Sequence, residues 1–152
     1  MAVTAYFYQK CLADLFGGVT EAEATTYYGI DLLTNTINVL MMNTYTPNRA
    51  THQFVSDVTG AGTESSGTGY SRKTLATKTL ALATNVLKFD AADVAWTTST
   101  FTAQYAVIYK YTDATDSHCP VICYIDNGAT LTTSAGTFTL TFSATGIATI
   151  TM

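Results

Sequence analysis

The sequence has few charged residues. Only 12% of its 152 residues carry a charge, whereas about a quarter do in an average soluble protein. The 7 Lys and Arg residues are spread through the chain and the net charge is -4, so no basic surface suited to a nucleic-acid backbone is expected. A surface this poor in charge favours contact with other protein.

Long apolar runs and paired cysteines are also missing. No apolar run approaches the roughly 20 residues that cross a bilayer, and the N-terminus has no basic region followed by an apolar core. We therefore expect neither a membrane span nor a secretory signal. The cysteines, Cys11, Cys119 and Cys123, are odd in number and do not form a disulfide pattern. Reduced thiols are the simpler expectation.

Leu, Glu and Lys are sparse, while threonine is abundant, which favours strands over helices. Residues 104–126 predict a hairpin at the centre of the fold. Its first arm alternates with period 2 but is apolar on both faces, as in a strand covered on both sides, either inside a sandwich or at an interface between subunits. Asp113, Asp116 and Ser117 provide turn residues, and Pro120 begins the second arm.

The N-terminal part contains the best helical pattern. Apolar residues recur with helical spacing at Tyr8, Cys11, Leu12 and Leu15, and two glycines follow, so a short helix is expected near residues 10–16. Residues 19–28 have no clear period and fit either a second short helix or a loop. The next segment, 37–42, reads as the first strand of the core sheet.

The remainder predicts strands with short connections. Residues 59–69 read as a flexible loop, residues 72–82 as one strand, and Asn127-Gly128 as a tight turn. Strands at such spacing predict a mainly β, single-domain protein spanning residues 1–152, a β-sandwich or barrel-like arrangement of antiparallel sheets with one or two short N-terminal helices. Residues 1–34 form its N-terminal helical or extended segment and 35–152 its β core. The residues expected in or beside the core are Met42, Trp96, Val107, Ile125, Leu140 and Phe142.

No arrangement of residues indicates catalysis. His52, Ser56 and Asp57 include the residue types of a nucleophilic triad, but triads do not assemble from adjacent residues. The next candidates, His118, Cys119 and Cys123, would need a fourth ligand to hold zinc, and the Asp pairs at 90 and 93 and at 113 and 116 lack the calcium-loop pattern. We expect no enzyme activity, no cofactor and no metal site.

Several segments, taken together and in order, resemble a known group of proteins. They are TINVLMMNTYTPNRATHQFVSDV, GYSRKTL, LKFDAADVAWTT, YAVIYKYTDATDSHCPVICYID and GTFTLTFSATGIATI. The set, which covers residues from about 35 to the C-terminus, resembles small structural proteins of tailed-bacteriophage virions. The resemblance implies a non-catalytic component of the virion that is assembled in the host cytoplasm.

Within that group, a capsid decoration or cement protein is the role we expect, on the capsid exterior. Its partners would be the major capsid protein and its own copies, as a homotrimer, because decoration proteins of similar phages often occupy three-fold positions. The alternative is a tail or head-fibre component with a carbohydrate- or receptor-binding module. Exposed tyrosines clustered in a concave pocket would favour that alternative.

The N-terminal aromatic residues are the candidate contacts. Large aromatic side chains can dominate an interface, and chain ends lie where a neighbouring molecule can be reached. Alternatively, these rings cover one open end of the core. The extent to which they are buried decides between the two roles. The candidate capsid or subunit contacts are Tyr6, Phe7, Tyr8, Tyr27 and Tyr28.

Overall fold

The computed structural model describes residues 5–15 and 29–151. Over these residues the chain is mainly β, with antiparallel sheets and two short helices, which confirms the predicted fold class. In chain order the elements are β1 (Ala5–Phe7), α1 (Gln9–Leu15), β2 (Ile37–Tyr45), α3 (Val55–Gly60), β3 (Gly62–Glu64), β4 (Lys73–Thr74), β5 (Thr79–Ala83), β6 (Val86–Asp90), β7 (Val94–Lys110), the 3-10 turn η1 (Asp116–His118), β8 (Val121–Leu140) and β9 (Ala148–Thr151).

The larger sheet is centred on the β7–β8 hairpin, as the sequence predicts. Its strand order is β1-β8-β7-β2-β3, and β4 also pairs with β2. Where β2, β7 and β8 lie side by side, both faces are apolar and buried, because the sheet is covered on both sides. Neighbours across these strands are Leu40, Val107 and Tyr124 on one face, and Met41, Ala106 and Ile125 on the other.

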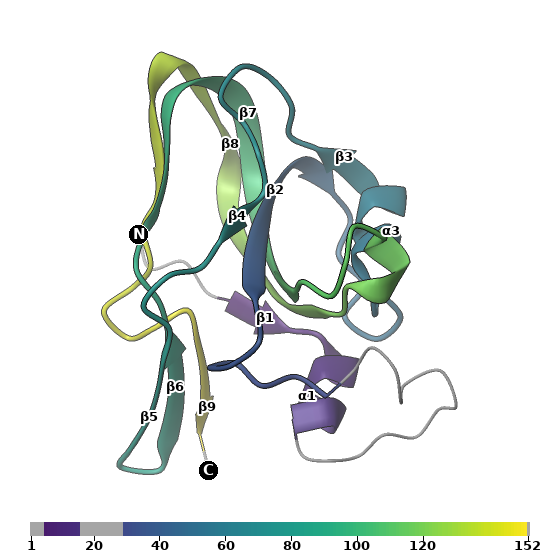
Figure 1. Ribbon diagram of the computed structural model, residues 1–152, viewed down its shortest axis with the longest axis vertical. Helices are drawn as coiled ribbons and strands as arrows, with labels where there is room; N and C mark the ends of the chain where they lie inside the picture. The colour runs from purple at the N-terminus through teal and green to yellow at the C-terminus, as the bar shows by residue number, and fades with distance from the viewer. Residues whose placement is uncertain (1–4, 16–28, 152) are drawn as a thin grey trace.

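Strands β7 and β8 are long, at 17 and 20 residues, and they bend together (Figure 1). Their register shifts between Trp96 and Ser99 and again between Ala103 and Tyr105, and Thr98 has a left-handed backbone with φ 51°. Each register shift marks a β-bulge, in which one strand has an extra residue, and such bulges bend a pair of strands. Residues 94–98 and 136–140 therefore turn away from the main sheet and form part of a second layer. We call this bent hairpin the arch.

The smaller sheet, β5-β6-β9, continues the second layer below the arch (Figure 1). Its first two strands form a hairpin closed by Thr84 and Asn85, whose φ values of 47° and 63° fit a two-residue type I′ turn. Strand β9 pairs with the other side of β6. We call the β5–β6 hairpin the arm, because it extends from the body of the molecule.

The two helices cover parts of the main sheet. Helix α1 follows β1, which pairs with β8 at the edge of the sheet. Helix α3 buries Val55 and Val58, and the Asp57 carboxylate accepts the backbone N–H groups of Gln53 and Phe54 at 2.8 and 3.0 Å. These bonds satisfy donors at the helix start that have no intrahelical partner. They therefore fix where α3 begins.

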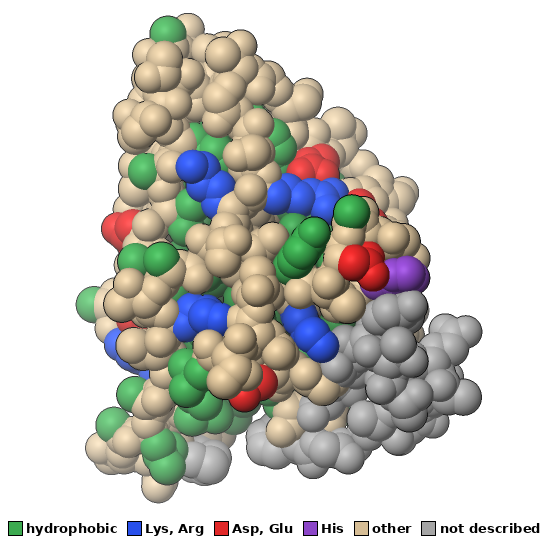
Figure 2. Space-filling model, viewed as in Figure 1, with side chains coloured by type: hydrophobic (Ala, Val, Ile, Leu, Met, Phe, Trp, Pro, Cys, Tyr) green, Lys and Arg blue, Asp and Glu red, His purple; other side chains and the backbone are tan. Residues whose placement is uncertain are grey.

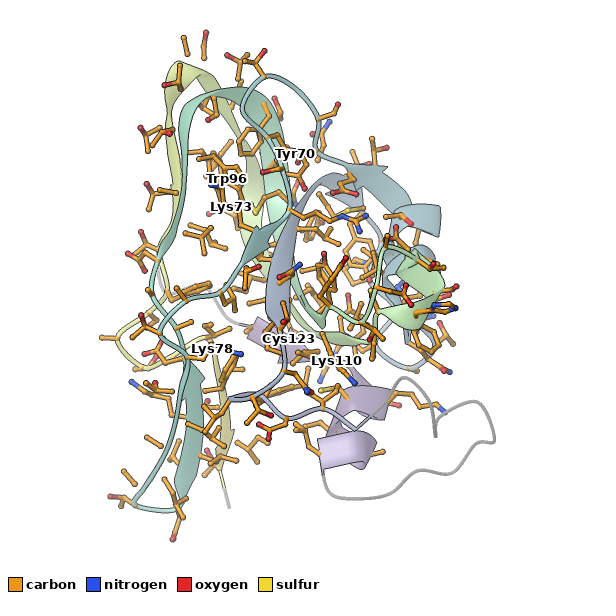
Figure 3. All side chains as sticks on the ribbon, viewed as in Figure 1. Tyr70, Lys73, Lys78, Trp96, Lys110 and Cys123 are labelled. Atoms are coloured by element: carbon orange, nitrogen blue, oxygen red, sulfur yellow. The ribbon has the colours of Figure 1, made fainter. Side chains whose placement is uncertain are left out.

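Trp96 is buried inside the arch. Its indole has no exposed surface, and its Nε1 donates a hydrogen bond to the Ser71 carbonyl oxygen at 2.7 Å. Tyr70 stacks on it with ring centroids 6.4 Å apart, and Lys73 Nζ lies 5.9 Å from the ring centroid. Figure 3 shows the three side chains near one another. The predicted core residues are confirmed: Met42, Trp96, Val107, Ile125 and Phe142 are buried, and Leu140 packs against them.

Three segments differ from the predictions. Residues 72–82 are not one strand, because the chain changes layers at Thr77, which has φ 52° and separates β4 from β5. Asn127-Gly128 does not reverse the chain but lies inside β8, where extra residues bulge and Gly128 has φ 73°. Residues 59–69 contain β3 and the buried Ser65, whose hydroxyl donates to the Thr102 carbonyl at 2.7 Å.

The remaining strand and helix predictions fall close to the observed bounds. The predicted strand 37–42 is β2, which runs on to Tyr45, and the predicted helix near 10–16 is α1, Gln9–Leu15. The first arm of the predicted hairpin is the second half of β7, which begins earlier, at Val94. The segment 19–28, including Tyr27 and Tyr28, lies outside the described residues.

Candidate functional site

The N-terminal aromatic residues have unequal surroundings. Tyr8 is fully buried, and its hydroxyl is hydrogen-bonded at 2.7 Å to that of Tyr45, which in turn lies 2.7 Å from His52 Nδ1. Tyr124 packs beside Tyr8 with ring centroids 5.7 Å apart. Burial raises the pKa of Tyr8 far above its usual value and raises that of Tyr45 to about 12. Tyr8 is therefore a core residue and is not available for contact.

Tyr6 and Phe7 remain closer to the surface. Tyr6 is 39% exposed and stacks on Tyr124 at 5.2 Å, while the Arg49 guanidinium lies 5.6 Å from its ring. Arg49 also donates from Nε to the Phe7 carbonyl at 2.9 Å, which ties β1 to the loop after β2. The side chain of Phe7 is half-buried and packs against the core. Of the candidate contacts within the described residues, Tyr6 is thus the one with a substantial exposed surface.

An apolar groove lies between the smaller sheet and the N-terminal elements, and Phe7 lines it. The groove has a volume of about 370 Å³. Among the described residues that line it, the one charged residue, Asp31, already accepts the backbone N–H groups of Leu33 and Thr34 at 2.9 and 3.0 Å. The groove is therefore suited to apolar groups. Its lining residues are Phe7, Leu15, Ile30, Asp31, Leu32, Leu80, Leu87, Phe89, Ala148 and Ile150.

The arm continues this apolar surface into solvent. Leu80 and Leu82 lie on the same face of β5, opposite Phe89 and Leu87 of β6, and they are 40% and 65% exposed. Figure 2 shows hydrophobic side chains gathered at this end of the molecule, at the lower left. The opposite face of the arm has smaller and polar side chains and carries Lys88, which pairs with Asp90 at 3.2 Å. The smaller sheet is thus amphipathic, with one apolar face only partly covered.

A second cleft, of about 360 Å³, lies under the arch. Met41, Ala106 and Ile125 of the main sheet form one wall, and residues 138–143 form the other. Gln104 at its rim is hydrogen-bonded to Asp126 at 3.2 Å and Thr130 at 3.4 Å. No tyrosine of the described residues lines this cleft or the apolar groove. The tyrosine-lined pocket that would favour glycan binding does not occur at either place.

The strongest electrostatic feature is structural. Arg72 donates to Glu64 from two nitrogens, at 2.7 and 2.9 Å, and to Asp116 at 2.5 and 3.0 Å. These hydrogen bonds raise the pKa of Arg72 well above its usual value. Tyr70 donates its hydroxyl to the same Glu64 at 2.8 Å. The cluster joins β3, the chain before β4 and the turn η1, with one guanidinium shared between two carboxylates.

The residues that the sequence offered for catalysis have local structural partners. His52 is hydrogen-bonded to Tyr45 and Asp57 accepts bonds at the start of α3, so they do not form a triad with Ser56. His118 Nδ1 lies 2.8 Å from Asp113, and the Cys119 thiol donates to the Asp113 carbonyl at 3.3 Å. Within residues 5–15 and 29–151, no group of three or more His, Cys, Asp and Glu side chains could hold a metal ion.

The sequence did not single out the arm or the apolar groove. The sequence TLALA contained a signal for the arm, because it is an uncharged strand whose two leucines share a face. The groove had no such signal, because it depends on pairing between β6 and β9, which lie far apart in the chain. Among the described helices, none is long and apolar enough to cross a membrane. Comparison of the chain with protein families, curated proteins and solved structures found no match.

Proposed function

We propose that the protein is a non-enzymatic structural component of a tailed-phage virion, a decoration protein that binds the major capsid protein on the outside of the head. The sequence resemblance supports the virion, and the apolar groove supports the binding role. A groove of about 370 Å³, in which the described residues offer no available charged group, is suited to an apolar anchor from a protein surface.

The distribution of tyrosines favours this function over a glycan-binding fibre module. Sugar-binding sites use aromatic faces within a concave pocket, whereas Tyr6 and Tyr111, at 39% and 41% exposure, lie outside both clefts. The other described tyrosines are buried or half-buried. The resemblance implies a homotrimer, so a three-fold contact between copies of the chain belongs to the same proposal.

The experiment that tests the proposal is quantitative mass spectrometry of purified virions from a phage that encodes this sequence. A decoration protein is expected in a copy number comparable to that of the major capsid protein. A fibre component would occur in far fewer copies, and absence from the virion would refute the proposal.

Binding through the groove is tested with two glutamate variants on strand β9. Ile150 lines the groove, whereas the adjacent Thr149 is exposed on the opposite face beside Lys88. We expect Ile150→Glu to lose co-sedimentation with empty heads and Thr149→Glu to retain it, with both variants still folded by circular dichroism. Equal binding by the two variants would place the contact elsewhere.

A further inference from the structure

The outer edge of β5 lacks the features that normally protect an edge strand. Natural edge strands are protected by charges, prolines, bulges or a covering segment, because their free main-chain groups can pair with another strand. Strand β5 reads TLALA, contains no charge or proline, pairs in unbroken register with β6, and is exposed at every residue. Within the described residues, no backbone hydrogen bond reaches β5 from any strand other than β6.

The hairpin register identifies the free main-chain groups. In a hairpin with a two-residue turn, the residues that flank the turn, here Ala83 and Val86, exchange hydrogen bonds, and alternate pairs follow. Ala81 and Thr79 therefore bond inward to β6. The N–H and C=O groups of Leu80 and Leu82 point outward, toward the open edge.

We infer that β5 pairs antiparallel with β5 of a second copy of this chain, around a two-fold axis at Ala81. This register sets Leu80 opposite Leu82 of the second copy, so the outward main-chain groups of both residues form hydrogen bonds. The strand is self-complementary in this register and carries no charge that would oppose its own copy. The inference does not rest on a role in the virion.

The pairing also extends the apolar face. Leu80 and Leu82 are on the side of the arm that carries Leu87 and Phe89, so the two copies would share one six-stranded sheet with a continuous apolar face. An isologous two-fold contact is the commonest interface in homo-oligomers. It leads to a dimer, or to a hexamer if a separate three-fold contact also exists.

The first test measures the mass of the full-length protein by sedimentation between about 1 and 100 μM, for wild type, Leu82→Lys and Leu33→Lys. Leu82 and Leu33 are both exposed, at 65% and 46%, but Leu33 is in the turn before β2 and does not belong to the arm. We expect an even-numbered assembly for wild type and Leu33→Lys, and half that mass or a monomer for Leu82→Lys. A wild-type trimer or monomer, or a mass unchanged by Leu82→Lys, would overturn the inference.

The second test checks the register by cysteine cross-linking. In this register, Ala81 of one copy lies opposite Ala81 of the second copy, and the two residues exchange no hydrogen bonds. The Cα atoms of such a pair lie about 4.5 Å apart, which is within disulfide range. The three native cysteines are buried. Under mild oxidation, most of an Ala81→Cys sample should become a disulfide-linked dimer, whereas Ala95→Cys, exposed on β7, should stay unlinked. Failure of Ala81→Cys to cross-link above the Ala95→Cys level would refute this register.

Discussion

Replacing Trp96 with alanine should strongly destabilise the protein, because this side chain connects the two layers. The ring is fully buried among Tyr70, Phe101 and Phe138, with centroids 5.8 to 6.4 Å away, and it donates to Ser71. Truncation of a buried Trp to Ala costs about 3 to 5 kcal/mol. Loss of the donor to the Ser71 carbonyl adds about 1 kcal/mol, the low end for an orphaned group, because Ser71 is near solvent.

The assay is urea unfolding followed by far-UV circular dichroism. Trp96 is the only tryptophan, so its fluorescence cannot report on the variant. We expect Trp96→Ala to lose about 4 to 6 kcal/mol of unfolding free energy, the sum of those two contributions. For a chain of this size that corresponds to a drop in Tm of roughly 10 to 20 °C.

The smaller change Trp96→Phe separates the two contributions, because it keeps an aromatic ring and removes the donor. Its cost should be about 2 kcal/mol. Leu131→Ala, at an exposed position on β8, is the control and should change stability by less than about 0.5 kcal/mol. A loss below about 1 kcal/mol for Trp96→Ala would refute the role of this residue in joining the layers.

Three further predictions follow from the described contacts. Burial raises the pKa of Cys123 from 9.0 to about 12 and that of Tyr8 above its usual 10.0, so the unfolded chain loses these protons first. The Tm of the wild-type protein should therefore fall as the pH rises above about 9, and it should fall less steeply with pH in Tyr8→Phe. In urea unfolding, Arg72→Ala should lower the free energy of unfolding by roughly 1 to 2 kcal/mol, because both carboxylates are partly exposed. Arg72→Lys should lose most of the same amount, because lysine cannot make paired hydrogen bonds to two carboxylates. Equal stability of Arg72→Lys and wild type would contradict this. Gly67, with φ 138°, lies so close to the Thr100 carbonyl that an added methyl group would overlap it, so Gly67→Ala should lower stability by more than about 2 kcal/mol. Gly128, with φ 73°, has open space around it, so Gly128→Ala should cost only about 1 kcal/mol. Similar losses of Tm for the two variants would show that the close approach is unimportant.

Local pattern was sufficient to predict β2, the β7–β8 hairpin and the six core residues named from the sequence, but not β3 of the same sheet. The two-sided apolar alternation at Val107 and Ile125 has one physical meaning, a strand covered on both faces, and the structure has this arrangement. Likewise the helical spacing of Tyr8, Cys11 and Leu15 predicted α1 within one residue. These features depend on neighbours in the chain.

Features that depend on distant contacts were not predicted. Asn127-Gly128 has the composition of a turn, but pairing of the surrounding residues with β7 keeps the strand running through it. Tyr8 proved to be a core residue because its hydroxyl is hydrogen-bonded to that of Tyr45, which is 37 residues away in the chain. The apolar groove requires β9 beside β6, and no short-range pattern specifies that pairing.

The arch has a consequence for how the molecule opens. Because β7 and β8 run through both layers, no described break in these strands separates one layer from the other. Amide hydrogens at 105–109 and at 94–96 should therefore exchange with solvent through the same global opening, as a single cooperative unit. The arm, held to the body through β9, is free to open separately, so its amides should exchange first.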